Sequence, residues 1–180
     1  FAARLNNDLA GFGGDVFYLR NVVSAAQFYP LAPGWVLSAS AKTGHILGIG
    51  EDVEIADRFF LGGDNLRGFA NAGVGPRDKS TKDSLGGEWM YHGGVELTVP
   101  LGLPDELGVN GRLFTDVGGL STVSPSSSNV LDSANPRASI GAGVGWISPF
   151  GPINVDMGWA FLKEDLDETE VLRFNFGTRF

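Results

Sequence analysis

The sequence predicts an all-β protein, an antiparallel transmembrane β-barrel meander of eight strands, because three features agree. Stretches in which every second residue is apolar recur along the whole chain, at the period of a β-strand. The connections between them alternate between compact, proline-marked turns and long polar loops, as in outer-membrane barrels. The chain also contains 27 glycines and 13 phenylalanines among 180 residues, a composition that favours a strongly curved sheet.

The first half of the chain contains four expected strands, which cover residues 1–9, 15–29, 35–43 and 88–99. In the first strand Phe1 and Leu5 lie on the apolar face, and in the third strand Trp35 and Leu37 do. The second strand is apolar on both faces over part of its length, so its register stays open. The fourth alternates less strictly, with Val95 on its apolar face.

The second half contains four more expected strands, which cover residues 108–118, 137–146, 153–161 and 172–180. The first of these alternates loosely, whereas Trp146 and Trp159 mark the apolar faces of the next two. The last is the most regular, with Leu172, Phe174 and Phe176 on one face. Aromatic residues near strand ends are typical of the girdle of a membrane barrel. A soluble β-sandwich shows similar alternation, but polar faces rich in glycine and arginine favour a crowded lumen over solvent.

The connections separate two sides of the expected sheet. Compact turns occupy residues 30–34, 100–108 and 148–152, and long polar loops occupy 48–87, 120–137 and 163–170. Consecutive connections of a meander lie on opposite sides, so we expect the long loops on the cell exterior and the turns in the periplasm. The first connection, 11–14, is the exception, because it is short where the pattern allows a long one. We expect a single domain, residues 1–180, with one long inserted loop at about 48–87.

The composition argues against several classes of function. The net charge of −8 disfavours nucleic-acid binding, and without cysteine there is no thiolate chemistry. The two histidines lack metal-ligand spacing, and no nucleophile or phosphate motif occurs. The acidic stretch 163–170 could hold a cation through Asp165, Asp167 and Glu168, but a solvated loop is the preferred interpretation. We therefore expect neither an enzyme, nor a metal site, nor a cofactor.

The glycine-rich stretch FLGGDNLRGF in the longest loop contains Arg67. An arginine removed from water needs carboxylate partners, and its planar fork suits them better than lysine does. Glu96 and Asp116 lie on the polar faces of the two strands that follow the loop. We therefore expect Arg67 to fold into the lumen and pair with Glu96, Asp116 or both; the alternative is a solvated arginine.

Four stretches, FFLGGDNLRGF, GVGPRD, SPFGPINVDMGWAF and the terminal FNFGTRF, resemble the C-terminal half of the barrel of the BamA family of outer-membrane protein assembly factors. The resemblance covers essentially the whole chain. It implies that Arg67, Gly68 and Phe69 close the sixth extracellular loop and that Glu96 and Asp116 receive the arginine. We call these five residues the loop lock. Leu66 stands where the family more usually has valine.

The resemblance also implies half of a barrel of about sixteen strands, without the family's periplasmic repeats. In the family the first and last strands pair weakly and form a lateral gate, so residues 172–180 are expected to form the seam strand. Its expected functional residues are Leu172, Phe174, Phe176, Gly177 and Phe180. Gly177 weakens pairing or, more simply, packs against the lumen, and Phe180 resembles the terminal signal of barrel proteins.

The function implied is that of part of an insertase that folds β-barrel proteins into the bacterial outer membrane. Its implied partners are outer-membrane lipids and lipopolysaccharide, client barrels, and accessory lipoproteins bound through the missing repeats. The alternatives are a related two-partner translocator, a passive porin or structural barrel, and an enzyme barrel that uses His92. The sequence leaves open whether eight strands close alone, self-associate or form half of a larger sheet. The chain starts in mid-strand, so we expect a processed chain or a fragment.

Overall fold

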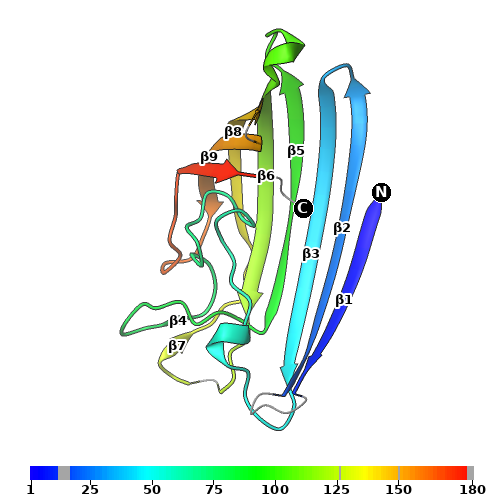
Figure 1. The fold of residues 1–180 in the computed structure, drawn as a ribbon. Coiled ribbons are helices and arrows are strands. Elements are labelled where there is room, and N and C mark those ends of the chain that lie inside the picture. Colours follow the sequence, from blue (N-terminus) through cyan, green and yellow to red (C-terminus); the bar gives the residue numbers. More distant parts are fainter. Residues whose placement is uncertain (12–16, 126, 150, 178–180) are drawn as a thin grey trace.

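A computed structural model describes residues 1–11, 17–125, 127–149 and 151–177 and shows one antiparallel eight-stranded sheet (Figure 1). In sheet order the strands are β1 (Ala2–Ala10), β2 (Tyr18–Ala32), β3 (Trp35–Gly48), β5 (Trp89–Pro100), β6 (Val109–Ser121), β8 (Arg137–Ser148), β9 (Gly151–Leu162) and β10 (Leu172–Phe176). Each pairs with its predecessor in the chain, which confirms the predicted all-β meander of eight strands.

The long connections contain small elements that the sequence did not predict. Strands β4 (Arg77–Asp78) and β7 (Val130–Leu131) pair with each other and join two of the long loops. Two single 3₁₀ turns, η1 (Ile55–Asp57) and η2 (Asp105–Leu107), complete the secondary structure. Within the described residues, no helix has the length and apolar character needed to cross a membrane.

The turn expected at 30–34 is shorter than predicted. Strand β2 continues to Ala32, and β3 begins at Trp35. A register shift between Pro30 and Ala32 lets the chain extend past Pro30, which has no N–H to donate to the ladder. Parts of three other connections lie outside the described residues: 12–14 in the first, Ser126 in the loop 120–137 and Phe150 in the turn at 148–152.

The two faces of the sheet differ in exposure as the alternation predicts. On the outer face Trp146, Trp159 and Phe174 are 44%, 69% and 60% exposed. On the opposite face, which we call the lumen face, Asp116 and Asp156 are 6% and 1% exposed. The outer face therefore exposes large apolar side chains, whereas the lumen face buries these two carboxylates.

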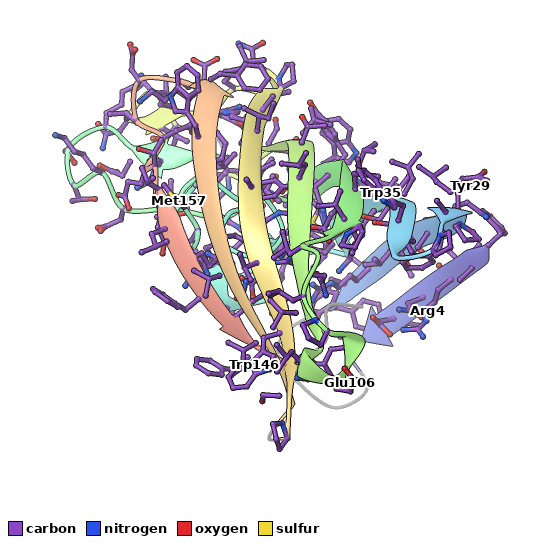
Figure 2. The ribbon with its side chains drawn as sticks, turned by 90° about the horizontal axis from the view of Figure 1, so that it is seen from above. Arg4, Tyr29, Trp35, Glu106, Trp146 and Met157 are labelled. Carbon is purple, nitrogen blue, oxygen red and sulfur yellow. The ribbon has the colours of Figure 1, made fainter. Side chains whose placement is uncertain are left out.

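The sheet is open. Among the described residues β1 pairs only with β2 and β10 only with β9, so these two strands form its edges. Figure 2 shows the strands from above as one curved layer, with Met157 and Arg4 toward its opposite ends. Residues 2–9 of β1 are exposed on both faces, whereas the long loop covers the lumen face farther along the sheet.

The long loop between β3 and β5 supplies most of the hydrophobic core. The buried cluster consists of Ile46, Val53, Phe59, Leu61, Leu66, Phe69, Val74, Met90, Leu120 and Ala160. Six of these, from Val53 to Val74, belong to the loop itself. The loop is therefore an inner layer packed on the sheet. A closed eight-stranded barrel would have no room for it, because side chains alone fill the interior of such a barrel.

If the outer face meets lipid, an arginine there is penalised. We expect Phe174→Arg to reduce the free energy of folding into bilayers by about 2–4 kcal/mol, whereas Phe174→Leu changes it little. Urea titration of the full-length protein folded into lipid vesicles measures this. Equal stability of the arginine and leucine variants would show that Phe174 does not face hydrocarbon.

Candidate functional site

The tip of the long loop turns sharply at glycines. Gly62, Gly63 and Gly68 have φ angles of +129°, +64° and +89°, a region that side chains with a Cβ rarely adopt. The amide of Gly63 donates to the carbonyl of Phe69 at 2.9 Å, which closes the tip on itself. Phe69 is fully buried in the core cluster. The fold of the tip thus points Arg67, which precedes Gly68, toward the sheet.

Arg67 is only 5% exposed and meets both carboxylates that the sequence singled out. Its Nε and Nη2 donate to the two oxygens of Asp116 at 2.7 and 2.9 Å, and its backbone N–H donates to the same group at 3.2 Å. Its Nη1 donates to Glu96 Oε2 at 2.5 Å. This bidentate pairing is the arrangement for which the guanidinium fork is suited. The arginine is also held from its face, because its Cζ lies 3.4 Å from the centroid of the Phe114 ring.

Two further charged residues extend this network, and sequence reasoning did not assign them to the site. Arg112 on β6 donates to Asp156 on β9 and lies 3.6 Å from Glu96 Oε1. Asp156 also lies 4.0 Å from Arg67 Nη1. The order Asp116, Arg67, Glu96, Arg112, Asp156 alternates in sign across three strands and the loop. Their inward parity was visible in the sequence, but which inward residues meet depends on strand register.

Glycines on neighbouring strands leave space for the buried carboxylates. A Cβ at Gly94, the cross-strand partner of Asp116, would overlap the Asp116 carboxylate. A Cβ at Gly143, the partner of Asp156, would likewise overlap that carboxylate. The charged network therefore lies in gaps that glycine opens in the lumen face.

The loop backbone itself rests on a glycine of β9. A Cβ at Gly158 would lie 2.7 Å from the nitrogen and 2.9 Å from the Cα of Gly68. A Cβ at Gly68 would in turn lie 3.0 Å from the Cβ of Ser139. A methyl group on either glycine would push the loop away from β9. The two facing glycines therefore set how closely the loop approaches the sheet.

The other arginines of the loop tie it to neighbouring loops. Arg58, which is 8% exposed, donates to the carbonyls of Val53, Leu85 and Ser124. Arg77 pairs with Glu168 at 2.9 Å.

At the outer end of the loop, hydrogen bonds from the Ser80 hydroxyl, the Thr81 and Ser80 amides and the Asn129 side chain lower the pKa of the Asp78 carboxyl to about 2. Asp78 is thereby kept charged where the loop meets the β7 loop.

The expected seam residues lie on or next to β10. Leu172, Phe174 and Phe176 point to the outer face and are 45%, 60% and 80% exposed, and Phe180 lies outside the described residues. Gly177 follows the end of the strand, and a Cβ there would meet nothing within 4 Å. The roles expected of Gly177 in strand pairing or lumen packing stay predictions, whereas its φ of +108° is a backbone conformation that favours glycine.

No group of residues in the described ranges resembles a metal site. Two of the acidic residues in the stretch 163–170 form ion pairs with arginines elsewhere in the chain: Asp167 pairs with Arg137 and Glu168 with Arg77. His92 lies on the lumen face of β5, and its Nε2 is buried without a hydrogen-bond partner.

Comparisons with known proteins identify the family of the chain. The model of the Omp85 superfamily domain matches residues 1–180. The outer membrane protein assembly factor BamA of Neorickettsia risticii is 39% identical over 182 residues, which is 100% of this chain and 24% of that protein. The mouse sorting and assembly machinery component 50 homolog is 39% identical over 114 residues, which is 62% of this chain and 24% of that protein. This chain thus spans about a quarter of the length of these relatives.

A solved structure shares the fold. The crystal structure of BamA from Haemophilus ducreyi lacking POTRA domains 1–3 superposes with a TM-score of 0.84 at 23% identity, over 96% of this chain and 37% of that one. At this identity the similarity shows the fold alone. The sequence resemblance to BamA proteins is confirmed by these matches.

Because Arg67 and Asp116 are buried together, their contributions to stability are expected to be coupled. Arg67→Ala leaves Asp116 unpaired and Glu96 with only the longer contact to Arg112, and it is expected to cost about 3–5 kcal/mol. Combining it with Asp116→Ala is expected to cost less than the sum of the single changes. Urea unfolding of the four proteins gives the coupling energy. Strict additivity would mean that the contact contributes nothing to stability.

The glycine contact under the loop makes a second prediction. Gly158→Ala is expected to displace the loop and cost about 1–3 kcal/mol. Gly145→Ala is the matched control, because its Cβ would meet only the ends of the Asn110 and Asn154 side chains, which can move. Protease sensitivity of the loop is the readout. Equal sensitivity in the two variants would exclude Gly158 as the loop's support.

Proposed function

The chain belongs to the Omp85 superfamily, and from this membership we propose that it is part of an insertase that folds and inserts β-barrel proteins into the bacterial outer membrane. In this proposal residues 1–180 form one domain, the C-terminal half of a larger barrel. The long loops face the cell exterior and the short turns the periplasm. The names of its full-length relatives, BamA and the sorting and assembly machinery component, support it.

The single observation that carries the proposal is the buried pairing of Arg67 with Asp116 and Glu96. A passive pore needs no loop fixed inside it, and the loop here occupies the space beside β5 and β6. In the proposed mechanism the loop lock keeps the long loop bound to the lumen face. The loop then stays in place while the seam opens and closes.

The seam itself is proposed to act through its backbone. Strand β10 has only five residues, and among the described residues its outer edge has no partner strand. Free N–H and C=O groups at such an edge can template an incoming strand by β-augmentation. The aromatic outer face of β10, formed by Leu172, Phe174 and Phe176, would meet lipid beside the client. Insertion then needs neither a nucleotide nor a metal.

The proposed partners follow from this arrangement. Lipids and lipopolysaccharide contact the outer face, and client barrels contact the seam. Accessory lipoproteins would bind soluble repeats of the full-length protein.

In cells that depend on the full-length protein, Arg67→Ala is expected to lower the outer-membrane level of client barrels several-fold. Arg67→Lys keeps the charge but not the fork, so an intermediate level is expected. Lys163→Ala, at an exposed residue of another loop, is the control. Quantifying client barrels in isolated membranes, at matched levels of the variants, tests the proposal. Wild-type client levels with Arg67→Ala would refute the role of the lock.

A further inference from the structure

The tip of the long loop is hydrogen-bonded to the segment that leads into β10. The amide of Ala70 donates to the carbonyl of Glu168 at 2.9 Å, and the amide of Glu170 donates to the carbonyl of Gly68 at 3.1 Å. Phe69 and Thr169 form the antiparallel bridge between them. The connection between β9 and β10 therefore pairs with the loop lock itself.

This bridge leads directly into the last strand. Only Val171 separates Glu170 from the first residue of β10, and the carbonyl of Val171 already accepts from Gly158 on β9. β10 pairs with residues 153–157 of β9, so the pairing with β9 gives way to the pairing with the loop within a few residues. In Figure 1 the orange-red connection lies beside the long loop. The loop thus determines where β10 begins.

A side chain of β10 makes the same link. Arg173 points to the lumen face and pairs with Asp64 of the loop tip at 3.3 Å and with Glu170. A Cβ on Gly63 would lie 3.2 Å from both Nη1 and Nη2 of Arg173, so the guanidinium lies over the glycine turn. The arginine spans from the seam strand to the loop tip.

The bridge also requires a glycine at its far end. The amide of Glu168 donates to the carbonyl of Gly73 at 2.9 Å, and a Cβ at Gly73 would lie 2.5 Å from the carbonyl oxygen of Glu168. Any larger residue would push the segment 168–170 away from the loop. Gly73, Phe69 and Arg173 therefore hold the two segments together at three points.

We propose that this contact couples the loop lock to the seam, with Arg173 as a positioning residue: releasing Arg67 loosens β10, and freeing β10 loosens the loop. The inference deepens the proposed function, on which it rests for its biological meaning. An exposed ion pair alone is weak, so the backbone bridge carries most of the coupling and Arg173 sets its position. Coupling of this kind is reciprocal between the two sites.

Hydrogen–deuterium exchange of the full-length protein in lipid nanodiscs tests the coupling, with peptides covering residues 61–70 and 172–176 as readouts. Arg67→Ala is expected to speed exchange in 172–176 about tenfold, although the carboxylates that Arg67 pairs with lie on β5, β6 and β9. Arg173→Gln is expected to speed exchange in 61–70 by a smaller factor. In a Gly73→Ala background, Arg67→Ala is expected to have no further effect on 172–176.

The matched controls lie in the same loop. Gly50→Ala adds the same methyl group where no atom lies within 4 Å, although its φ of +86° makes it the more strained site. Asp83→Asn neutralises an exposed loop carboxylate as Asp64→Asn does. Gly50→Ala is expected to leave exchange in 172–176 unchanged, and Asp83→Asn is expected to leave exchange in 61–70 unchanged.

The outcomes separate the coupling from the proposed function. Faster exchange in 61–70 with unchanged 172–176 in Arg67→Ala would overturn the coupling, even if client assembly fails. Faster exchange in both peptides supports the coupling, even if client barrels assemble normally, and in that case it is the proposed function that fails. If Gly73→Ala does not fold, Arg173→Gln and Asp64→Asn decide alone: no change in 61–70 with either refutes the inference.

Discussion

The burial of one guanidinium group is the constraint on which the rest of this structure depends. Arg67 lies at 5% exposure, where an unpaired charge is severely penalised. Asp116 supplies two oxygens and Glu96 a third, and Arg112 lies between Glu96 and Asp156 and extends the network. These groups come from β5, β6, β9 and the loop, so the network can exist only when the sheet has its native register. The loop and the sheet therefore define each other's positions.

The unusual glycine content follows from the same constraint. An inner layer can approach a sheet closely only where side chains are missing, and Gly94, Gly143 and Gly158 provide those gaps beneath the carboxylates and the loop backbone. Glycine is unfavourable in strands because it packs nothing. Here the long loop contributes the apolar side chains instead, from Val53 to Val74, and the core forms between loop and sheet. The high glycine content, the inner position of the loop and the burial of Arg67 therefore depend on one another.

The fold was predictable from the sequence to a large extent, and the site in part. Alternation located all eight strands because its period is local, and the same parity placed Glu96 and Asp116 on the lumen face. The odd or even position of a residue shows which face of the sheet it lies on, but not which residues of neighbouring strands lie beside it. The contact of Arg112 with Asp156 therefore could not be derived before the strand register was known. The positive φ of Gly177 was not predictable either, because in a sequence a glycine required by its φ angle looks the same as a glycine required by close packing.

The distribution of contacts implies a division between a fixed and a changeable part. Strands β5, β6 and β9 have 12 or 13 residues each and carry the charged network, whereas among the described residues β10 has 5. Local opening is easiest where pairing is short and buried apolar contacts are few. Strand β10 meets both conditions, since its apolar side chains face outward and the lumen-facing Arg173 pairs with Asp64 of the loop. The last strand is therefore held by its ladder with β9 and by the contacts of Arg173 and of residues 168–170 with the loop. If β10 forms the seam, as proposed, it can loosen without unfolding the strands that hold Arg67 and its partners.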